Sequence, residues 1–268
     1  MTRPIVFLTD YGLDDEFVGV CHGVITRIAP DARVIDLAHG IPPQDVLRGA
    51  LVLAAAAPYM PEDAVYLAVV DPGVGGARGA VAVATEAGAL LVGPDNGLLS
   101  LAWQELGGPI KAVEISAPDR MLERVSATFH GRDVFAPAAA HLANVADLND
   151  LGPDVDLSSL QHMHVPAPGI ADGELTAVVT GVDRFGNLEL NARPDDLAEA
   201  ALGDAGSLTL RHAGGTAGIR VARTFEDVPP GDPALIEGSS GYLAVVVNMG
   251  SAARRLGLSA GSDLALTR

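Results

Sequence analysis

The first 145 residues alternate between strand-like and helix-like segments, and this alternation limits the fold more than any other feature of the chain. Residues 4–10 are a short apolar run that ends in an acid, and residues 14–30 carry apolar side chains at helical spacing. Residues 32–38 return to a strand pattern, which completes a β-α-β unit. Because this order recurs, we predict an α/β domain with a mostly parallel sheet covered by helices.

The later segments of this half continue the alternation. A helix is expected in residues 41–60, with Pro42 and Pro43 in its first turn, where proline fits best. The remaining expected elements are a strand at 64–71, a strand pair at 79–95, a helix at 96–107, a strand at 110–116 and a helix at 133–144.

The second half of the chain has a different composition and periodicity. Residues 163–174 are rich in proline, glycine and small side chains, as linkers often are. Short segments with a period of two follow, separated by glycine-rich turns, and they predict a smaller all-β barrel or sandwich. We therefore expect an α/β catalytic domain over residues 1–165 and a β domain over residues 166–268.

Charge and cysteine content exclude several classes of function. The chain has 34 acidic and 17 basic residues, so its formal charge of -17 repels nucleic acid and anionic membranes. Cys21 is the single cysteine, which excludes an internal disulfide and favours a cytoplasmic protein. Neither a secretory signal nor an apolar run of membrane-spanning length is visible.

Polar residues follow three of the expected strands. In open α/β sheets, ligands bind beyond the carboxyl ends of the strands, so these residues are the first candidates for a site. Asp10 and Asp15 follow the first strand, and Asp71 with Arg78 follows the third. His130 lies in an HGRD segment at an expected helix entrance. These residues also have purely structural interpretations. Asp10 or Asp15 could cap the following helix, and Asp71 could form a loop ion pair with Arg78.

Other kinds of chemistry have weaker sequence support. The GVGGARG segment lacks the glycine order of a dinucleotide site and the lysine of a P-loop. A metal site built from His130, Asp133, His141 and Asp95 matches no established spacing, and no GxSxG elbow is present. Asn96 lies in a Pro-Asp-Asn-Gly segment whose composition first predicts a turn. A role for Asn96 in the functional site is the secondary hypothesis.

Two segments of the β domain carry side chains suited to a purine. One contains Asp183, Phe185 and Asn187, and the other contains Ser239, Ser240 and Asn248. An aromatic ring can stack on a purine, and an amide can form hydrogen bonds with the edge of the purine. The first segment is also ordinary turn composition, so the sequence leaves both readings open.

Six blocks of sequence, in order, resemble the S-adenosylmethionine hydroxide adenosyltransferase family, the hydrolytic relatives of the fluorinases and chlorinases. The blocks are TDYGLDDEFVGVCHGVI, VVDPGVGGAR, GPDNGLL, SATFHGRDVFAPAAAHLA, VDRFGNLELN and SSGYLAVVVNMGSAA. The resemblance implies displacement by water at the ribose 5′ carbon of S-adenosyl-L-methionine, which yields adenosine and L-methionine. It implies no metal and no cofactor, because S-adenosylmethionine is the substrate.

The resemblance also assigns residues. It implies a catalytic triad of Asp71, Arg78 and His130, with Asp10 on the ribose diol. The remaining implied substrate contacts are Asp15, Asp183, Ser239 and Ser240 around the amino acid, Phe185, Asn187 and the backbone near Asn248 and Met249 around adenine, and Phe129 and Gly131 beside His130. Gln44 and Ser240 depart from the halogenating relatives, which have tryptophan and arginine there. The family implies a homotrimer with sites between subunits.

Two positions separate this chain from its halogenating relatives. By resemblance they bind halide with a serine where this chain has Gly131, and they lack the charge of Asp71, which would repel an anion. We therefore interpret Gly131 as leaving room for a water molecule. The rival hypotheses are a 5′-halogenase and a binding protein for S-adenosylmethionine or adenosine that catalyses no reaction.

Overall fold

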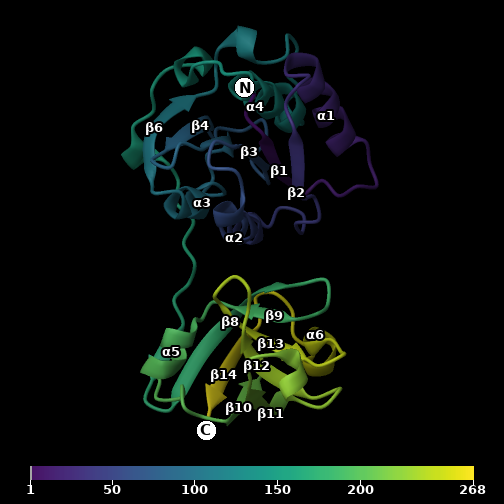
Figure 1. Ribbon diagram of the computed structural model, residues 1–268, viewed down its shortest axis with the longest axis vertical. Helices are drawn as coiled ribbons and strands as arrows, with labels where there is room; N and C mark the ends of the chain where they lie inside the picture. The colour runs from purple at the N-terminus through teal and green to yellow at the C-terminus, as the bar shows by residue number, and fades with distance from the viewer. Residues whose placement is uncertain (1) are drawn as a thin grey trace. The chain divides into compact units, whose positions relative to one another are not determined.

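The computed structural model describes residues 2–268, which form two compact units, one ending at Met163 and the other beginning at His164. The first unit contains a sheet and helices, and the second is mostly strands (Figure 1). Each unit has its own apolar core.

The first unit follows the predicted alternation. Its elements are β1 (Ile5–Thr9), α1 (Phe17–Ile28), β2 (Val34–Ala38), α2 (Val46–Ala56), η1 (Ala57–Tyr59), β3 (Val65–Val69), β4 (Ala80–Thr85), β5 (Leu90–Pro94), α3 (Ser100–Glu105), β6 (Pro109–Glu114), η2 (Pro118–Arg120), η3 (Gly131–Phe135), α4 (Ala136–Ala143), η4 (Leu148–Leu151) and η5 (Leu157–Ser159).

The sheet of the first unit has six strands in the order β2-β1-β3-β5-β4-β6. β2, β1, β3 and β5 are parallel, and β4 is antiparallel to both β5 and β6. β6 therefore points in the same direction as β5. The predicted mostly parallel sheet is confirmed, and so is the strand pair expected at 79–95.

Helices cover both faces of this sheet, because the side chains of a strand point alternately to opposite faces. Ile5 and Phe7 of β1 pack into the core under α1 and α4, whereas Val6 and Leu8 pack into the core under α2 and α3. Figure 1 shows the two helix pairs on opposite sides of the sheet. All five residues of β1 are buried, which explains its uninterrupted apolar sequence.

One local prediction is wrong. Pro42 and Pro43 do not form the first turn of α2, which begins at Val46. The Asp45 side chain caps the helix by accepting a hydrogen bond of 2.9 Å from the backbone N–H of Arg48. A side-chain cap that satisfies a free N–H decides the start of the helix here, and the prolines stay in the preceding loop.

The second unit is a small β-barrel. Its elements are β7 (Gly169–Ala171), β8 (Glu174–Val182), β9 (Leu188–Leu190), α5 (Pro194–Glu199), β10 (Ser207–His212), β11 (Gly215–Val221), η6 (Phe225–Asp227), β12 (Pro233–Glu237), β13 (Leu243–Val247), α6 (Ala252–Leu256) and β14 (Asp263–Thr267).

Pairing between β14 and β8 closes the barrel. The strand order is β14-β10-β11-β12-β13-β9-β8, and β7 pairs with β8 beside this ring. The predicted β domain is thus confirmed as a barrel, although α5 and α6 were not expected. Both helices have six residues or fewer, which is too short for a helical period to show in the sequence. Within residues 2–268, no helix is long and apolar enough to cross a membrane.

Candidate active site

The order of the strands creates a crevice at one edge of the first sheet. The chain passes from β1 through α1 to β2 on one side, then returns through α2 to β3 on the other side of β1. The carboxyl ends of β1 and β3 therefore border a topological switch point, where open α/β sheets bind ligands. Asp10 directly follows β1, and Asp71 lies two residues beyond β3.

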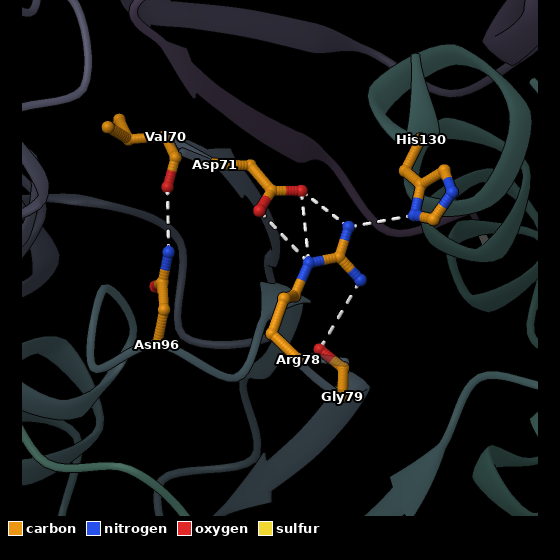
Figure 2. Close-up of polar contacts among 6 residues, drawn as sticks. All are labelled: Val70, Asp71, Arg78, Gly79, Asn96 and His130. Atoms are coloured by element: carbon orange, nitrogen blue, oxygen red, sulfur yellow. Dashed lines mark hydrogen bonds and ion pairs between the residues drawn. The ribbon is translucent and has the colours of Figure 1, made fainter. Parts of the chain in front are cut away.

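A side chain from the next strand fixes the end of β3. Asn96, which follows β5, donates a hydrogen bond of 2.9 Å to the backbone carbonyl of Val70 (Figure 2). The Asn96 side-chain oxygen accepts a hydrogen bond of 3.2 Å from the N–H of Leu98, as expected in a turn. Asn96 therefore holds the turn and also positions the residue that precedes Asp71.

Asp71 and Arg78 form a forked ion pair. The Arg78 Nε atom lies 3.0 Å and 3.1 Å from the two carboxylate oxygens of Asp71, and Nη2 also donates to Oδ2. Both side chains are nearly buried, with exposed fractions of 11% for Arg78 and 5% for Asp71. The ion pair that the sequence left open as a loop contact is therefore desolvated, and it interacts more strongly than a surface pair.

The same guanidinium reaches His130. Its Nη2 atom lies 2.8 Å from the Nδ1 atom of His130, so one nitrogen connects the carboxylate and the imidazole (Figure 2). An arginine N–H can only donate, so Nδ1 must accept, and the neutral ring carries its proton on Nε2. The structure thus brings together the three residues predicted for the triad, although His130 is 52 positions from Arg78.

The surroundings keep His130 neutral. Burial and the Arg78 guanidinium lower the pKa of His130 below its ordinary value of 6.5, although Asp71 and Asp133 oppose this shift. The Arg78 guanidinium also lies over the ring of Phe135, 5.1 Å from its centre. This contact restricts the guanidinium further, which keeps its bonds to both partners in place.

The loop between β3 and β4 approaches the loop that carries His130 closely. Gly75 has a φ of +72°, and a Cβ atom at that position would lie 2.2 Å from the carbonyl oxygen of Ala127. A side chain would therefore separate the two loops. Gly75 of the GVGGARG segment thus permits a contact between backbones, and phosphate binding is not needed to explain it.

A π-helical turn presents His130. The turn η3 directly follows His130 and leads into α4. Asp133 within it is buried and accepts a hydrogen bond of 2.8 Å from the N–H of Ser126, while Arg132 Nε donates to it at 2.6 Å. π-turns are rare and occur often at functional sites. Asp133 therefore fixes the loop before His130 and is not free to bind a metal.

A pocket of about 690 Å³ lies at this edge of the sheet. The predicted residues Asp10, Asp71, Phe129, His130 and Gly131 all line it. Its volume is within the range of small-molecule sites. The sequence missed several lining residues, including Tyr11, Phe17 and Val74.

Asp10 and Gln44 meet in the wall of this pocket. The Asp10 Oδ2 atom accepts a hydrogen bond of 2.8 Å from the backbone N–H of Gln44. Gln44 has a φ of +67°, a left-handed conformation that is strained for a residue with a side chain. Asp15 stays exposed in the loop before α1 and is not among the residues that line the pocket. Glu16 is the cap residue of α1 and makes no side-chain cap, so neither Asp10 nor Asp15 caps that helix.

The space beside Gly131 is occupied by a side chain. A Cβ atom built on Gly131 would lie 2.0 Å from the hydroxyl oxygen of Tyr11 and 3.0 Å from its ring carbon Cζ. The interpretation that Gly131 simply leaves room for water therefore needs correction. The absent side chain makes room for the phenol, and the two positions together shape this part of the pocket.

The predicted residues of the barrel line two pockets of their own unit. Asp183, Asn187, Ser239 and Ser240 line a pocket of about 360 Å³. Asp183 accepts hydrogen bonds from the N–H groups of Phe185 and Asn187, both at 2.9 Å, and from the Asn187 amide at 2.7 Å. The hairpin reading of this segment is therefore correct, and the same turn also borders a pocket.

The second barrel pocket is apolar at its edge. Phe185, Asn187 and Met249 line a space of about 490 Å³, and Phe185 and Met249 are 76% and 87% exposed. The side-chain amide of Asn248 donates a hydrogen bond of 2.7 Å to the carbonyl of Val228. Its side chain thus anchors a loop of the barrel and does not line either pocket.

The metal alternative finds no geometric support in residues 2–268, where no three His, Cys, Asp or Glu side chains are grouped to hold an ion. Asp95 accepts a hydrogen bond of 2.8 Å from the N–H of Gln161, and Asp133 pairs with Arg132. These two carboxylates therefore serve the structure of their loops.

The fold and the pocket together define an α/β domain with a small-molecule site at its switch point, followed by a β-barrel. Family models described as the SAM hydroxide adenosyltransferase N-terminal and C-terminal domains match residues 5–152 and 177–265. The chain belongs to the SAM hydroxide adenosyltransferase family.

Individual relatives agree with this assignment. A protein of Salinispora arenicola (strain CNS-205) named (R)-S-adenosyl-L-methionine hydrolase is 50% identical over 266 residues, covering 99% of this chain and 98% of the relative. A protein of Actinoplanes sp. (strain N902-109) named fluorinase is 30% identical over 293 residues, covering 99% and 98%. A crystal structure of an uncharacterized conserved protein from Thermotoga maritima has a TM-score of 0.91 and 34% identity, covering 98% and 100% of the two chains.

Proposed function

We propose that this chain hydrolyses S-adenosyl-L-methionine to adenosine and L-methionine by attack of water on the ribose 5′ carbon. The observation that carries the proposal is the bonded series Asp71, Arg78 and His130 at the edge of a ligand-sized pocket. Similarity to a hydrolase that acts on this compound supports the choice of substrate.

The chemistry of the substrate matches the arrangement of these groups. The sulfonium is a good leaving group and needs no acid, so the protein has to hold water in line with the carbon-sulfur bond and accept its proton. In our proposal, the Arg78 guanidinium stabilises the charge that develops on the water oxygen. Asp71 orients Arg78 and offers a carboxylate for the proton.

Histidine is a common general base, but His130 has a different role in our proposal. Its Nδ1 lone pair accepts a hydrogen bond from Arg78, so it is not available to take a proton while that bond persists. We propose that the ring orients the guanidinium and donates from Nε2–H. This role makes Asp71 the stronger candidate for the base.

The substrate contacts follow the family resemblance. We assign Asp10 to the ribose diol, because it lines the same pocket as Asp71 and His130. In the barrel, we assign Asp183, Ser239 and Ser240 to the amino acid portion of the substrate. Phe185 and Asn187 are assigned to adenine, because they border the adjoining pocket with an exposed ring and an amide.

Product identification tests the proposal. Both sulfonium epimers should be incubated separately with the protein, and the products separated by chromatography and weighed by mass spectrometry. We expect adenosine and methionine in equal amounts, with the (R) epimer preferred, since the hydrolase relative carries it in its name. Binding of the substrate without turnover of either epimer would contradict the proposal and favour a binding protein.

Halide transfer is the second candidate function, because a fluorinase covers 99% of this chain at 30% identity. Two features disfavour it. The Asp71 carboxylate beside the pocket repels a halide ion, and the Tyr11 phenol occupies the space where a serine at position 131 would extend. Incubation with chloride or fluoride should therefore yield adenosine without 5′-halo-adenosine.

The pH dependence of turnover follows from the state of His130. The ring must be neutral to accept from Arg78, and its pKa is lowered by burial and by that guanidinium. The neutral form therefore persists as the pH falls below 6.5, and it is lost only as the pH passes the lowered pKa. We expect the acid limb of the kcat profile below pH 6.5. A limb above pH 6.5 that disappears in His130→Asn would contradict this reading.

A further inference from the structure

The phenol of Tyr11 lies in the part of the pocket where the proposed reaction would occur. Tyr11 directly follows Asp10 at the end of β1, and it lines the same pocket as Asp71 and His130. Its hydroxyl oxygen would be 2.0 Å from a Cβ atom on Gly131, the residue next to His130. Tyr11 is therefore the neighbour that excludes a side chain at position 131.

A chain of polar groups holds the Tyr11 backbone. Its N–H donates a hydrogen bond of 3.2 Å to the hydroxyl of Thr9, which lies 2.8 Å from Nδ1 of His39. The Nε2 atom of His39 is 3.0 Å from a carboxylate oxygen of Asp36. Thr9 and His39 are buried, whereas Asp36 is exposed, so the inner part of this chain is shielded from solvent and restricts the position of the loop after β1.

Two aromatic rings hold the Tyr11 side chain. Its ring centre lies 5.9 Å from that of Phe17 and 5.6 Å from that of Phe129, the latter nearly perpendicular at 78°. Phe17 and Phe129 also pack edge to face, with ring centres 5.2 Å apart. The three rings form a mutually packed cluster, which leaves the Tyr11 hydroxyl little freedom to move.

The Tyr11 hydroxyl is not used by the fold. Among residues 2–268, no hydrogen-bond partner of this oxygen is found, although Thr9 holds the backbone of the same residue. Burial raises the pKa of Tyr11 well above its ordinary value of 10, and nearby Cys21, Asp10 and Asp71 raise it further, while Arg78 opposes them. The group thus remains a neutral O–H that can donate to one oxygen and accept from another.

We infer that Tyr11 is a specificity-determining residue of the hydrolysis, whose hydroxyl and Gly131 together limit the nucleophile to a group the size of water. This inference rests on the proposed function. The ring excludes any nucleophile with a carbon atom on its oxygen, and the hydroxyl oxygen can accept a hydrogen bond from water, which a halide ion has no proton to donate.

Competition between water and methanol measures this selection directly. Attack by methanol forms a bond from its oxygen to the 5′ carbon, breaks the carbon-sulfur bond, and releases methionine and one proton, giving 5′-O-methyladenosine. Attack by water gives adenosine by the same electron movement. The ratio of the two products, at a fixed methanol concentration, does not depend on how much of each variant is active.

Tyr11→Ala should raise the ratio of methyl ether to adenosine about tenfold or more, since exclusion of one methyl group is commonly worth 10-fold to 200-fold. Tyr66→Phe is the matched control, because it removes another buried tyrosine hydroxyl, one that donates to the carbonyl of Ala57 outside the pocket. Its product ratio should equal that of the wild type. An unchanged ratio in Tyr11→Ala would overturn the inference.

A compensating pair covers the case in which Tyr11→Ala does not fold. Gly131→Ala should lower adenosine formation at least tenfold, because its methyl group collides with the phenol oxygen. Tyr11→Phe removes that oxygen and with it the hydrogen bond to the water, so the double variant Tyr11→Phe, Gly131→Ala should recover part of the loss, measured against Gly131→Ala alone. Failure of the double variant to recover would overturn the inference, whereas a wild-type protein that forms neither product would overturn the proposed function itself.

Discussion

Replacing Arg78 with alanine is expected to lower kcat for adenosine formation by about a hundredfold or more, with a smaller change in KM. Arg78 donates hydrogen bonds to both Asp71 and His130, so its loss removes the charge that would stabilise a developing hydroxide. The substitution also leaves the Asp71 carboxylate, which is 5% exposed, without its partner. Steady-state kinetics on both sulfonium epimers measure the effect.

Two further variants sharpen the result. Arg78→Lys keeps the charge but lacks the fork that bonds both partners, so we expect an intermediate loss. Arg120→Ala removes an arginine of the same unit that pairs with Asp119 and Asp150, and its kcat should stay near that of the wild type. Near-normal turnover in a folded Arg78→Ala variant would remove Arg78 from the mechanism.

Replacing His130 with alanine is the second large effect, and we again expect a loss in kcat of about a hundredfold or more. The ring accepts a hydrogen bond of 2.8 Å from Arg78 and lines the pocket, so its removal frees the guanidinium and removes a donor from the pocket. KM should change less, because the residue is assigned to the nucleophile and not to the substrate. Steady-state kinetics of the folded variant measure both constants.

His130→Asn separates orientation from proton transfer. An asparagine oxygen can accept from Arg78 as Nδ1 does, but the amide cannot take up a proton at neutral pH. If His130 orients Arg78, the asparagine variant should recover at least tenfold over alanine. If it recovers nothing, the ring itself carries the proton and our assignment of its role is wrong. His141→Ala, on α4, serves as the control and should show wild-type kinetics.

Much of the fold was predictable from the sequence, because buried parallel strands and amphipathic helices leave regular patterns. The run Ile5–Thr9 is entirely buried and reads as a strand for that reason. The start of α2 was not predictable in the same way, because a single hydrogen bond to Asp45 outweighs the preference of proline for a first turn. α5 and α6 are too short to produce a period.

The site residues likewise include some that the sequence predicted and some that it did not. Asp10 and Asp71 were found from sequence because the carboxyl ends of parallel strands meet at one edge of a sheet. The hydrogen bond between Arg78 and His130 depends on how the loops that carry them pack together. The sequence suggested this contact only through a family resemblance. Tyr11 was missed, although it adjoins Asp10. The role of Tyr11 depends on its contact with Gly131, which is 120 positions away, and no local sequence pattern predicts such a contact.

The central claim is that a water molecule from solvent attacks the ribose 5′ carbon beside Asp71, Arg78 and His130. Turnover in oxygen-18 water, followed by mass spectrometry of both products, tests this claim most directly. We predict that one oxygen-18 atom appears in the 5′ hydroxyl of adenosine and none in methionine. Adenosine that forms without the label would contradict the account, because its 5′ oxygen would then come from a source other than water.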